Sequence, residues 1–471
     1  MTKLPFLCLL ILVIAIGSRA QTDVPAHFAN GIKVGEVTSD TAIIWTRLTK
    51  FPERNVDGKS FPKNNDKKRR SLDYPNLDTM EGAVPGLNGE VRLTYFPKGN
   101  PNSAMTTEWQ QVQLNENSTA QFELNDLQPA TLYEVNLEGR SSKDTPAAAV
   151  IGSFSTAPAV DDPATVSFAV VTGQDYPRRD DSENGHQIYP QMTKLGIDFF
   201  VHTGDIEYYD KAEPFADNIE LARFKWNRLY AMPFQRDFHN HTASYFIKDD
   251  HDTLKNDCWP GQQYGSVTFE EGVRLFNEEQ FPSRSPRYQT VQWGKDLQVW
   301  FLEGRDFRSP NTMVDGPEKT ILGAQQKSWL FKTLDASTAT FKLVFSPTPI
   351  VGPDRSGKKD NHANTIFAHE GEQLRRKFSS VDGVIVLCGD RHWQYASEDT
   401  ETGLWEFGCG PGSEKHQLGW KKGDVILTTP ISFLATSNAI VYSGATPEFV
   451  DIENTFYNID TQKLEKKIKD L

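Results

Sequence analysis

The sequence predicts an α/β domain that follows an all-β sandwich domain. Three observations support this. Short strands separated by turn residues fill the first third of the chain, apolar strands alternate with helical segments after residue 165, and a Pro- and Asp-containing linker at 157–163 separates the two patterns. A length of 471 residues also suits two or three domains, at roughly 150 residues per domain.

The chain begins with the features of a signal peptide. Lys3 precedes the apolar run Leu4–Ile16, and small residues then precede Gln21. The run is shorter than the roughly 20 apolar residues that a membrane-spanning helix needs. We therefore predict that residues 1–20 are removed, that the mature protein is secreted or periplasmic, and that the mature chain has no transmembrane segment.

The composition is acidic. The formal net charge is −13, and it becomes −15 when Lys3 and Arg19 leave with the signal peptide. An acidic chain is a poor nonspecific binder of nucleic acid, so specific nucleic-acid binding is not expected. Three cysteines remain, Cys258, Cys388 and Cys409, which is too few for a disulfide scaffold; one bridge or three buried thiols are both open.

Residues 21–158 are predicted to form the β-sandwich. Strand-like runs occur at Thr41–Leu48 and Glu90–Phe96, and apolar residues alternate with polar ones over Gln121–Glu138. Turn residues separate such runs at the spacing of a β-sandwich. The stretch Leu127–Tyr133 resembles the tyrosine-corner segment of fibronectin type III domains.

A polar insertion interrupts this domain at about residues 51–88. It is rich in Pro, Asn, Lys and Gly, and the segment Lys63–Arg70 is locally basic. The insertion is either a lid or guide for an anionic substrate or a solvated loop, and the solvated loop is the more common case for a charged run.

Residues 159–471 are predicted to form the α/β domain. Continuous apolar runs of four to six residues are typical of buried strands in a parallel sheet, and ligands of such sheets bind at the carboxyl ends of the strands. The predicted strands are 166–171, 197–202, 243–247, 297–302, 341–345 and 384–387, and the predicted helices are 186–195, 218–229 and 324–334.

Polar residues follow four of these strands, at Gly173–Asp175, Gly204–Tyr208, Asp249–Asn256 and Gly389–His392. Oxygen and imidazole donors at converging strand ends suit a dinuclear site for hard or borderline cations. Without cations, so many carboxylates would repel one another. Asp205 is the natural bridging ligand, because each of its two oxygens can hold one cation.

At these motifs the chain resembles the metallophosphoesterases, and within them the alkaline phosphatase D family. The matching stretches are Gly204–Tyr208 for GDxxY, Asp249–Asp252 for a DDHE-like block and Gly389–Trp393 for GDxHW, with further likeness at Leu322–Leu330, Asp360–His362, Gly31–Glu36 and Ile44–Leu48. The resemblance covers most of the mature chain. It implies a four-layer α/β/β/α sandwich after the fibronectin III-like domain.

The resemblance also implies a phosphoric ester hydrolase outside the cytoplasm, with calcium and iron or a similar metal pair. A metal-bound hydroxide would attack a small-molecule or polymer phosphoester. Asp205 would bridge the metals, Tyr208 would bind a ferric ion, and His251 would protonate the leaving group. The remaining predicted metal ligands are Asp250, Asn256, Asp390 and His392.

One departure from the family concerns Gly173, which stands where the family has a cysteine ligand. We predict that Asp175, two residues later, takes over ligation. An oxygen ligand in place of sulfur favours calcium, magnesium or manganese over thiolate-bound iron.

The predicted substrate-binding residues are Arg178, Arg305, Arg391 and His362. The three arginines are predicted because a guanidinium group can hold phosphate through two hydrogen bonds. Two alternatives stay open beside a phosphatase. One is a phosphodiesterase acting on nucleotides, lipids or cell-wall polymers. The other is a decayed hydrolase that serves as a ligand-binding or adhesion protein. The oligomeric state is left open.

Overall fold

The structure is a computed structural model that describes residues 24–61, 76–354, 357–413, 425–428, 446–450 and 461–470. The predicted signal peptide and the basic segment Lys63–Arg70 lie outside the described residues. No helix in the described part of the chain is long and apolar enough to cross a membrane.

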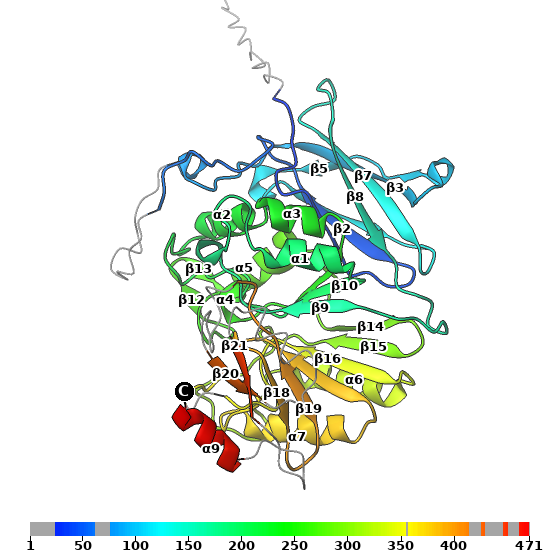
Figure 1. Cartoon of the computed structure of the whole chain (residues 1–471). Helices are drawn as coiled ribbons and strands as arrows, with labels where there is room; N and C mark the ends of the chain where they lie inside the picture. The colour runs from blue at the N-terminus through cyan, green and yellow to red at the C-terminus, as the bar shows by residue number, and fades with distance from the viewer. Residues whose placement is uncertain are drawn as a thin grey trace, which may run out of the picture.

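The first central sheet has six strands in the order β6-β2-β1-β11-β10-β9 (Figure 1). Strands β9, β10 and β11 are parallel, and β1 joins them by pairing in parallel with β11 at Gly35 and Ser244. The bounds are β1 Ile32–Gly35, β2 Ala42–Arg47, β6 Thr119–Leu124, β9 Phe168–Val171, β10 Phe199–His202 and β11 Ala243–Phe246.

The second central sheet has the order β14-β15-β16-β17-β19-β18. Its strands β15, β16, β17 and β19 are parallel, whereas β14 and β18 are antiparallel edge strands. The bounds are β14 Gln289–Trp293, β15 Leu297–Phe301, β16 Phe341–Ser346, β17 Val384–Cys388, β18 Tyr395–Glu398 and β19 Trp405–Gly408.

The two sheets pack face to face, and helices cover their outer faces (Figure 1). Aromatic rings fill the space between the sheets; for example, Tyr245 of β11 stacks on Phe301 of β15 at 4.4 Å between ring centroids. Helices α1 Ile188–Leu195, α2 Ile219–Leu229 and α3 Pro233–His239 cover the first sheet, and α6 Gly323–Ala336 and α7 Ala368–Ser379 cover the second. The layer order is therefore α/β/β/α.

A separate antiparallel sheet precedes these layers, in the order β4-β3-β7-β8 with β5 paired to β3. The Tyr133 hydroxyl accepts a hydrogen bond from the backbone N–H of Gln128 at 2.9 Å, which is the bond that defines a tyrosine corner. The predicted boundary at residue 158 stays a prediction. The bounds are β3 Gly89–Pro97, β4 Met105–Thr106, β5 Gln110–Val112, β7 Leu132–Arg140 and β8 Ala148–Ser155.

The helices and strands predicted in the α/β domain are present within about two residues of the predicted bounds. Asn218 explains one start, because its side chain accepts from the backbone N–H of Leu221 and caps α2. Strand β14 and helices α3 and α7 were not predicted, since their apolar residues are few and irregularly spaced. The remaining short elements are α4 Asp250–Thr253, β12 Gln263–Tyr264, β13 Val267–Thr268, α5 Phe269–Arg274 and a π-helical turn at Leu275–Gln280.

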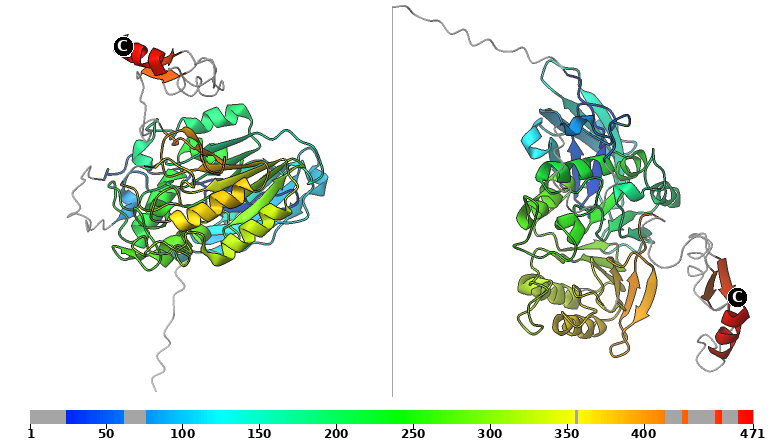
Figure 2. Two further views of the ribbon diagram at one scale, coloured as in Figure 1. Left: turned by 90° about the horizontal axis from the view of Figure 1, so that it is seen from below. Right: turned by 90° about the vertical axis from the view of Figure 1, so that its left-hand side faces the viewer.

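The described C-terminal elements are β20 Val425–Thr428, β21 Thr446–Phe449 and α9 Thr461–Asp470. Strands β20 and β21 pair in parallel, and Lys467 of α9 forms an ion pair with Glu448 of β21 at 2.7 Å. Both views in Figure 2 show these three elements apart from the layered body.

Candidate metal centre

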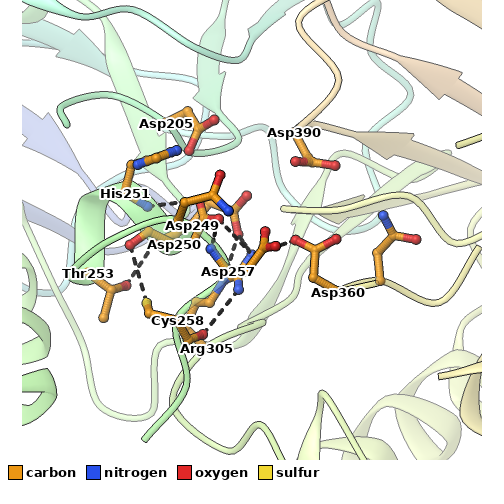
Figure 3. Close-up of polar contacts among 12 residues, drawn as sticks. Asp205, Asp249, Asp250, His251, Thr253, Asp257, Cys258, Arg305, Asp360 and Asp390 are labelled. Atoms are coloured by element: carbon orange, nitrogen blue, oxygen red, sulfur yellow. Dashed lines mark hydrogen bonds and ion pairs between the residues drawn. The ribbon is translucent and has the colours of Figure 1, made fainter. Parts of the chain in front are cut away.

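Two turns with left-handed backbone, one after β10 and one after β17, bring polar residues to one edge of the two sheets. Asp205, Asp390 and His392 have φ angles of 58°, 65° and 52°, which are rare for residues other than glycine. Such strained positions cluster at functional sites, where the surrounding structure holds them. Figure 3 shows Asp205 and Asp390 on opposite sides of a space that Asp250 and Asp360 also face.

Asp205, Tyr208, His251 and His392 form one part of this cluster, which we call the His392 side. His392 Nε2 lies 2.8 Å from Asp205 Oδ2 and 3.4 Å from the Tyr208 hydroxyl. Burial, and then the carboxylates of Asp205 and Asp175, hold the pKa of Tyr208 well above its ordinary value. A phenol in this position is therefore neutral unless a cation binds beside it.

His251 lies at the start of α4 and is held by a carboxylate. Its Nδ1 is 2.6 Å from Asp210 Oδ1, and its ring lies 4.3 Å from the Tyr208 ring. Burial alone would lower the pKa of His251, but the carboxylates of Asp250, Asp205 and Asp210 outweigh burial and raise the pKa to about 9. Protonated His251 therefore presents Nε2 as a proton donor.

Asp252 fixes the turn that carries Asp205. Its carboxylate accepts from the backbone N–H groups of Asp205, Ile206 and Glu207 at 2.7, 2.7 and 3.0 Å, and from that of Asp249 at 2.9 Å. This carboxylate ties the end of β10 to the end of β11. Asp252 thus stabilises the backbone of the turn that carries Asp205, and both of its carboxylate oxygens are used in these hydrogen bonds.

Asp257, Asp354, Asp360 and Asp390, with Lys358, form the other part of the cluster, which we call the Lys358 side. Lys358 Nζ lies 3.0, 3.2 and 3.3 Å from carboxylate oxygens of Asp257, Asp360 and Asp390. Burial, outweighed by Asp390 and Asp360, leaves the pKa of Lys358 far above its ordinary value. The chain itself places a permanent cation among these acids.

Three groups of side chains bring their donor atoms within 4.8 Å of one another. They are Asp205–Asp250–His251, Asp250–Asp257–Asp360 and Asp354–Asp360–Asp390. Several carboxylate oxygens in this region are buried without a partner in the described part of the chain: Asp175 Oδ1, Asp205 Oδ1, Asp249 Oδ2, Asp360 Oδ1 and Asp390 Oδ2. Orphaned buried oxygens of this kind fit hard or borderline cations, so the residues present suit a metal centre.

The structure explains how the glycine at 173 is accommodated. A Cβ built on Gly173 would lie 2.7 Å from His392 Nε2, and the backbone there has a φ of 63°. The His392 ring therefore occupies the space into which a side chain at 173 would extend. Asp175 is buried with a φ of 74°, and its Oδ2 lies 3.7 Å from Arg178 Nε; it belongs to none of the three converging groups.

The predicted substrate-binding residues have different surroundings. Arg305 is fully buried; its Nε donates to Asp249 Oδ1 at 2.7 Å, and Nη2 lies 2.5 Å from the same oxygen, so it acts as an internal counterion. Arg391 pairs with Asp354. His362 Nε2 lies 3.0 Å from Glu370 Oε2 of α7. Only Arg178, with 37% of its side chain exposed, is partly open to solvent beside Tyr208.

Asn256, predicted as a ligand, is exposed, and its backbone N–H donates to Asp210 at 3.0 Å. Sequence reasoning missed Asp210, Asp257 and Lys358. Asp210 and Asp257 each lie within two residues of a predicted ligand, which was the available signal. Nothing in the sequence pointed to Lys358, because a lysine two residues before an acid on a loop is usually exposed on the protein surface.

A family model described as "PhoD-like phosphatase" matches residues 168–442. Among solved structures, "Structure of PhoD" superposes with a TM-score of 0.65 and 18% identity, covering 90% of this chain and 82% of that one. A purple acid phosphatase from yellow lupin seeds superposes with a TM-score of 0.52 and 13% identity, covering 86% and 66%. At these identities, the two superpositions show the α/β fold with its two sheets.

A second family model, "DegT/DnrJ/EryC1/StrS aminotransferase family", matches residues 415–470 and overlaps the end of the first match. Over 43 residues the chain is 60% identical to an Escherichia coli dTDP-4-amino-4,6-dideoxy-D-glucose transaminase, and over 46 residues it is 46% identical to the Bacillus subtilis spore coat polysaccharide biosynthesis protein SpsC. These matches cover 9–10% of this chain. The chain spans 12%, or about an eighth, of these curated relatives.

Proposed function

The chain belongs to the PhoD-like phosphatase family, and we propose that it is a metal-dependent phosphoric ester hydrolase that hydrolyses phosphomonoesters outside the cytoplasm at a dinuclear or multinuclear site. The observation that carries this proposal is the group of buried, unpartnered carboxylate oxygens around Asp205. The predicted signal peptide supports an extracytoplasmic location. The tyrosine-corner bond of Tyr133 supports a fibronectin III-like N-terminal domain.

Asp205, Tyr208, Asp250, Asp390 and His392 would hold the metals. Bound cations would polarise the phosphoryl group and make water acidic enough to act as a nucleophile near neutral pH. Oxygen and nitrogen donors dominate the set, which supports calcium, magnesium or manganese with or without iron. Among the ligands predicted from the sequence, Asn256 is the least supported, because its side chain is exposed.

His251 supplies the proton that the leaving group needs. Asp210 engages Nδ1 at 2.6 Å and fixes the orientation of the ring, so that Nε2 carries the transferable proton. Asp250 and Asp205 keep the ring protonated. Lys358 and Arg178 add positive charge at two sides of the site and would favour an anionic substrate.

Asp175 remains our candidate to replace the missing cysteine ligand. Its Oδ1 is buried and has no partner in the described part of the chain, and its charge acts on Tyr208. We expect Asp175→Ala to lower the metal content of protein purified without added metal, because one oxygen donor is lost. Element analysis measures this, and an unchanged metal content would show that Asp175 is not a ligand.

A phosphodiesterase remains the second candidate; the partly exposed side chain of Arg178 beside Tyr208 is compatible with a substrate that carries a second substituent on phosphorus. A decayed hydrolase is less well supported, since the acids of the site stay buried together despite their mutual repulsion.

The test is hydrolysis of 4-nitrophenyl phosphate and bis(4-nitrophenyl) phosphate before and after removal of metal by a chelator. We expect the monoester to be hydrolysed faster, activity to disappear on chelation, and divalent cations to restore it. Activity that survives complete chelation would refute a metal-dependent reaction, and faster hydrolysis of the diester would favour the second candidate.

A further inference from the structure

A cavity of about 570 Å³ lies against η5, the short helix Tyr176–Arg178 that follows Asp175. Part of the insertion forms one wall and helix α2 forms another. Residues that line the cavity include Phe61, Glu81, Tyr176, Arg179, Glu213 and Arg228. A volume of this order suits a small organic ligand.

Arg228 of α2 is the unusual residue in this wall. It is 1% exposed, and its Nε and Nη2 have no hydrogen-bond partner in the described part of the chain. Its guanidinium lies 4.2 Å from the centroid of the Tyr176 ring. Its aliphatic stem is close to Gly82, where a Cβ would lie 3.1 Å from Arg228 Cδ. Packing holds the stem while buried donors remain unsatisfied, which is costly without an acceptor.

Other guanidinium groups gather around the same tyrosine. Arg179 lies 4.0 Å from the ring centroid of Tyr176, and Arg54 Nη1 donates to the Tyr176 hydroxyl at 3.2 Å. Glu81 compensates part of this charge, because it pairs with Arg54 at 3.0 Å and accepts from the Tyr176 hydroxyl at 2.6 Å. Glu81 thereby serves Arg54, Arg179 and Tyr176, and Arg228 forms no ion pair with a carboxylate in the described part of the chain.

The cavity is next to the reacting centre in the chain and in space. Tyr176 lines the cavity, and the residue before it, Asp175, is buried beside Tyr208. Arg178, 3.7 Å from Asp175 and 5.8 Å from the Tyr208 ring centroid, follows in sequence directly after Tyr176 and Pro177, which line the cavity. A substrate held at the metal centre could therefore extend its leaving group past Arg178 into the cavity.

We propose that this cavity is a leaving-group subsite that receives a second anionic group of the substrate, with Arg228 as its anchor and Tyr176 and Phe61 as its apolar walls. The proposal rests on the proposed phosphatase function and adds a substrate class to it: phosphoesters whose leaving group combines an apolar body with a carboxylate or phosphate. Two further acids, Asp180 and Glu213, also line the cavity, and Asp180 accepts a hydrogen bond from the backbone N–H of Gln187 at 3.3 Å.

The experiment compares phenyl phosphate with 4-carboxyphenyl phosphate in the metal-loaded protein. We expect Arg228→Met to reduce the ratio of kcat/KM for the carboxylated over the plain substrate by about tenfold or more, the worth of one hydrogen bond to a charged group. The difference in intrinsic reactivity between the two substrates cancels when the ratio of the variant is divided by that of the wild type. Arg376→Met on exposed α7 is the matched control and should keep the wild-type ratio.

Two further measurements keep the outcomes separate. Calorimetry with 4-carboxyphenyl phosphonate, which cannot be hydrolysed, should show at least a tenfold weaker Kd for Arg228→Met even if the protein proves inactive; an equal Kd would overturn the subsite. Arg228→Lys, checked by thermal melting, should give an intermediate ratio. A ratio unchanged in Arg228→Met with normal phenyl phosphate hydrolysis would refute the subsite alone, whereas failure to hydrolyse any phosphoester would refute the proposed function.

Discussion

The two sides of the carboxylate cluster balance their charge in different ways. On the Lys358 side, the chain supplies its own cation, which lies 3.0–3.3 Å from three carboxylates. On the His392 side, Asp205 faces a histidine and a phenol, and Asp205 Oδ1 has no partner in the described part of the chain. Asp360 Oδ1 and Asp390 Oδ2 on the Lys358 side also lack a partner in the described part of the chain. The difference teaches that the Lys358 side is partly neutralised by a fixed cation, whereas the His392 side depends on the titratable His251 and on bound metal.

The first prediction compares the same substitution on both sides. Asp205→Asn should lower kcat/KM and metal content, because the carboxylate predicted to bridge the metals is lost. The loss should exceed the ~10–100-fold that is typical when a residue hydrogen-bonded to a metal ligand is replaced. Asp257→Asn, on the Lys358 side, should have a smaller effect, because Lys358 remains. Steady-state kinetics and element analysis measure both, and equal losses would erase the distinction between the sides.

The second prediction separates proton donation from metal binding. His251→Gln should lower kcat by about 10²–10⁴-fold for an ester with a poor leaving group, which is the usual contribution of a general acid. The loss should be smaller for 4-nitrophenyl phosphate, because nitrophenolate leaves without a proton. Metal content should stay at the wild-type level. If the variant loses its metal, His251 is a ligand and not a proton donor.

The third prediction removes the internal cation. Lys358→Met should lower the free energy of unfolding of chelated protein by an order of 1–3 kcal/mol, since Asp257, Asp360 and Asp390 lose their common partner. Added calcium or manganese should restore most of this stability, because the vacated position suits a cation. Denaturant melts with and without metal measure this. Lys377→Met is the control, because this half-buried lysine of α7 pairs with a single, exposed acid, Asp335; an equal loss there would contradict the assignment.

The fourth effect, of the same order as the third, concerns pH. The folded-state pKa of His251, about 9, lies above the ordinary value of about 6.5, so its protonation stabilises the fold fully below pH ~6.5 and this stabilisation is lost as pH rises through 9. Between pH ~6.5 and 9, the free energy of unfolding of the chelated wild-type protein should fall by on the order of 2–3 kcal/mol more than that of chelated His251→Gln. Urea melts at several pH values test this, and parallel pH profiles would refute it.

The body of the molecule and its C-terminal segment show what sequence likeness can establish. Residues 168–442 match one family along most of a domain, and the motifs of that family meet in space at Asp205, Asp250 and Asp390. Residues 415–470 match another family model, and the chain spans about an eighth of the two curated relatives named above. Elements β20, β21 and α9 stand apart from the body, so the transaminase likeness adds no residue to the described site (Figure 2).

The sequence by itself determined the α/β domain, the strand ends that carry the site and the family, because apolar strands and the residues after them are local features. It also pointed to Asp205, Asp250, His251, Asp390 and His392, which the fold brings together. The partners of these residues depend on pairings distant in sequence. Asp210 reaches His251 across 41 residues, and Arg305 reaches Asp249 across 56.

Only the tertiary structure decided which charges are already neutralised and which await a partner. Arg305 looked like a phosphate ligand in the sequence, yet it is buried against Asp249, whereas Lys358 looked like a surface lysine and lies among three acids. Arg228 carried no signal in the sequence at all. A charged side chain is defined by the charges around it after folding, and Coulomb interactions in a buried site depend on distances that residue order alone does not contain.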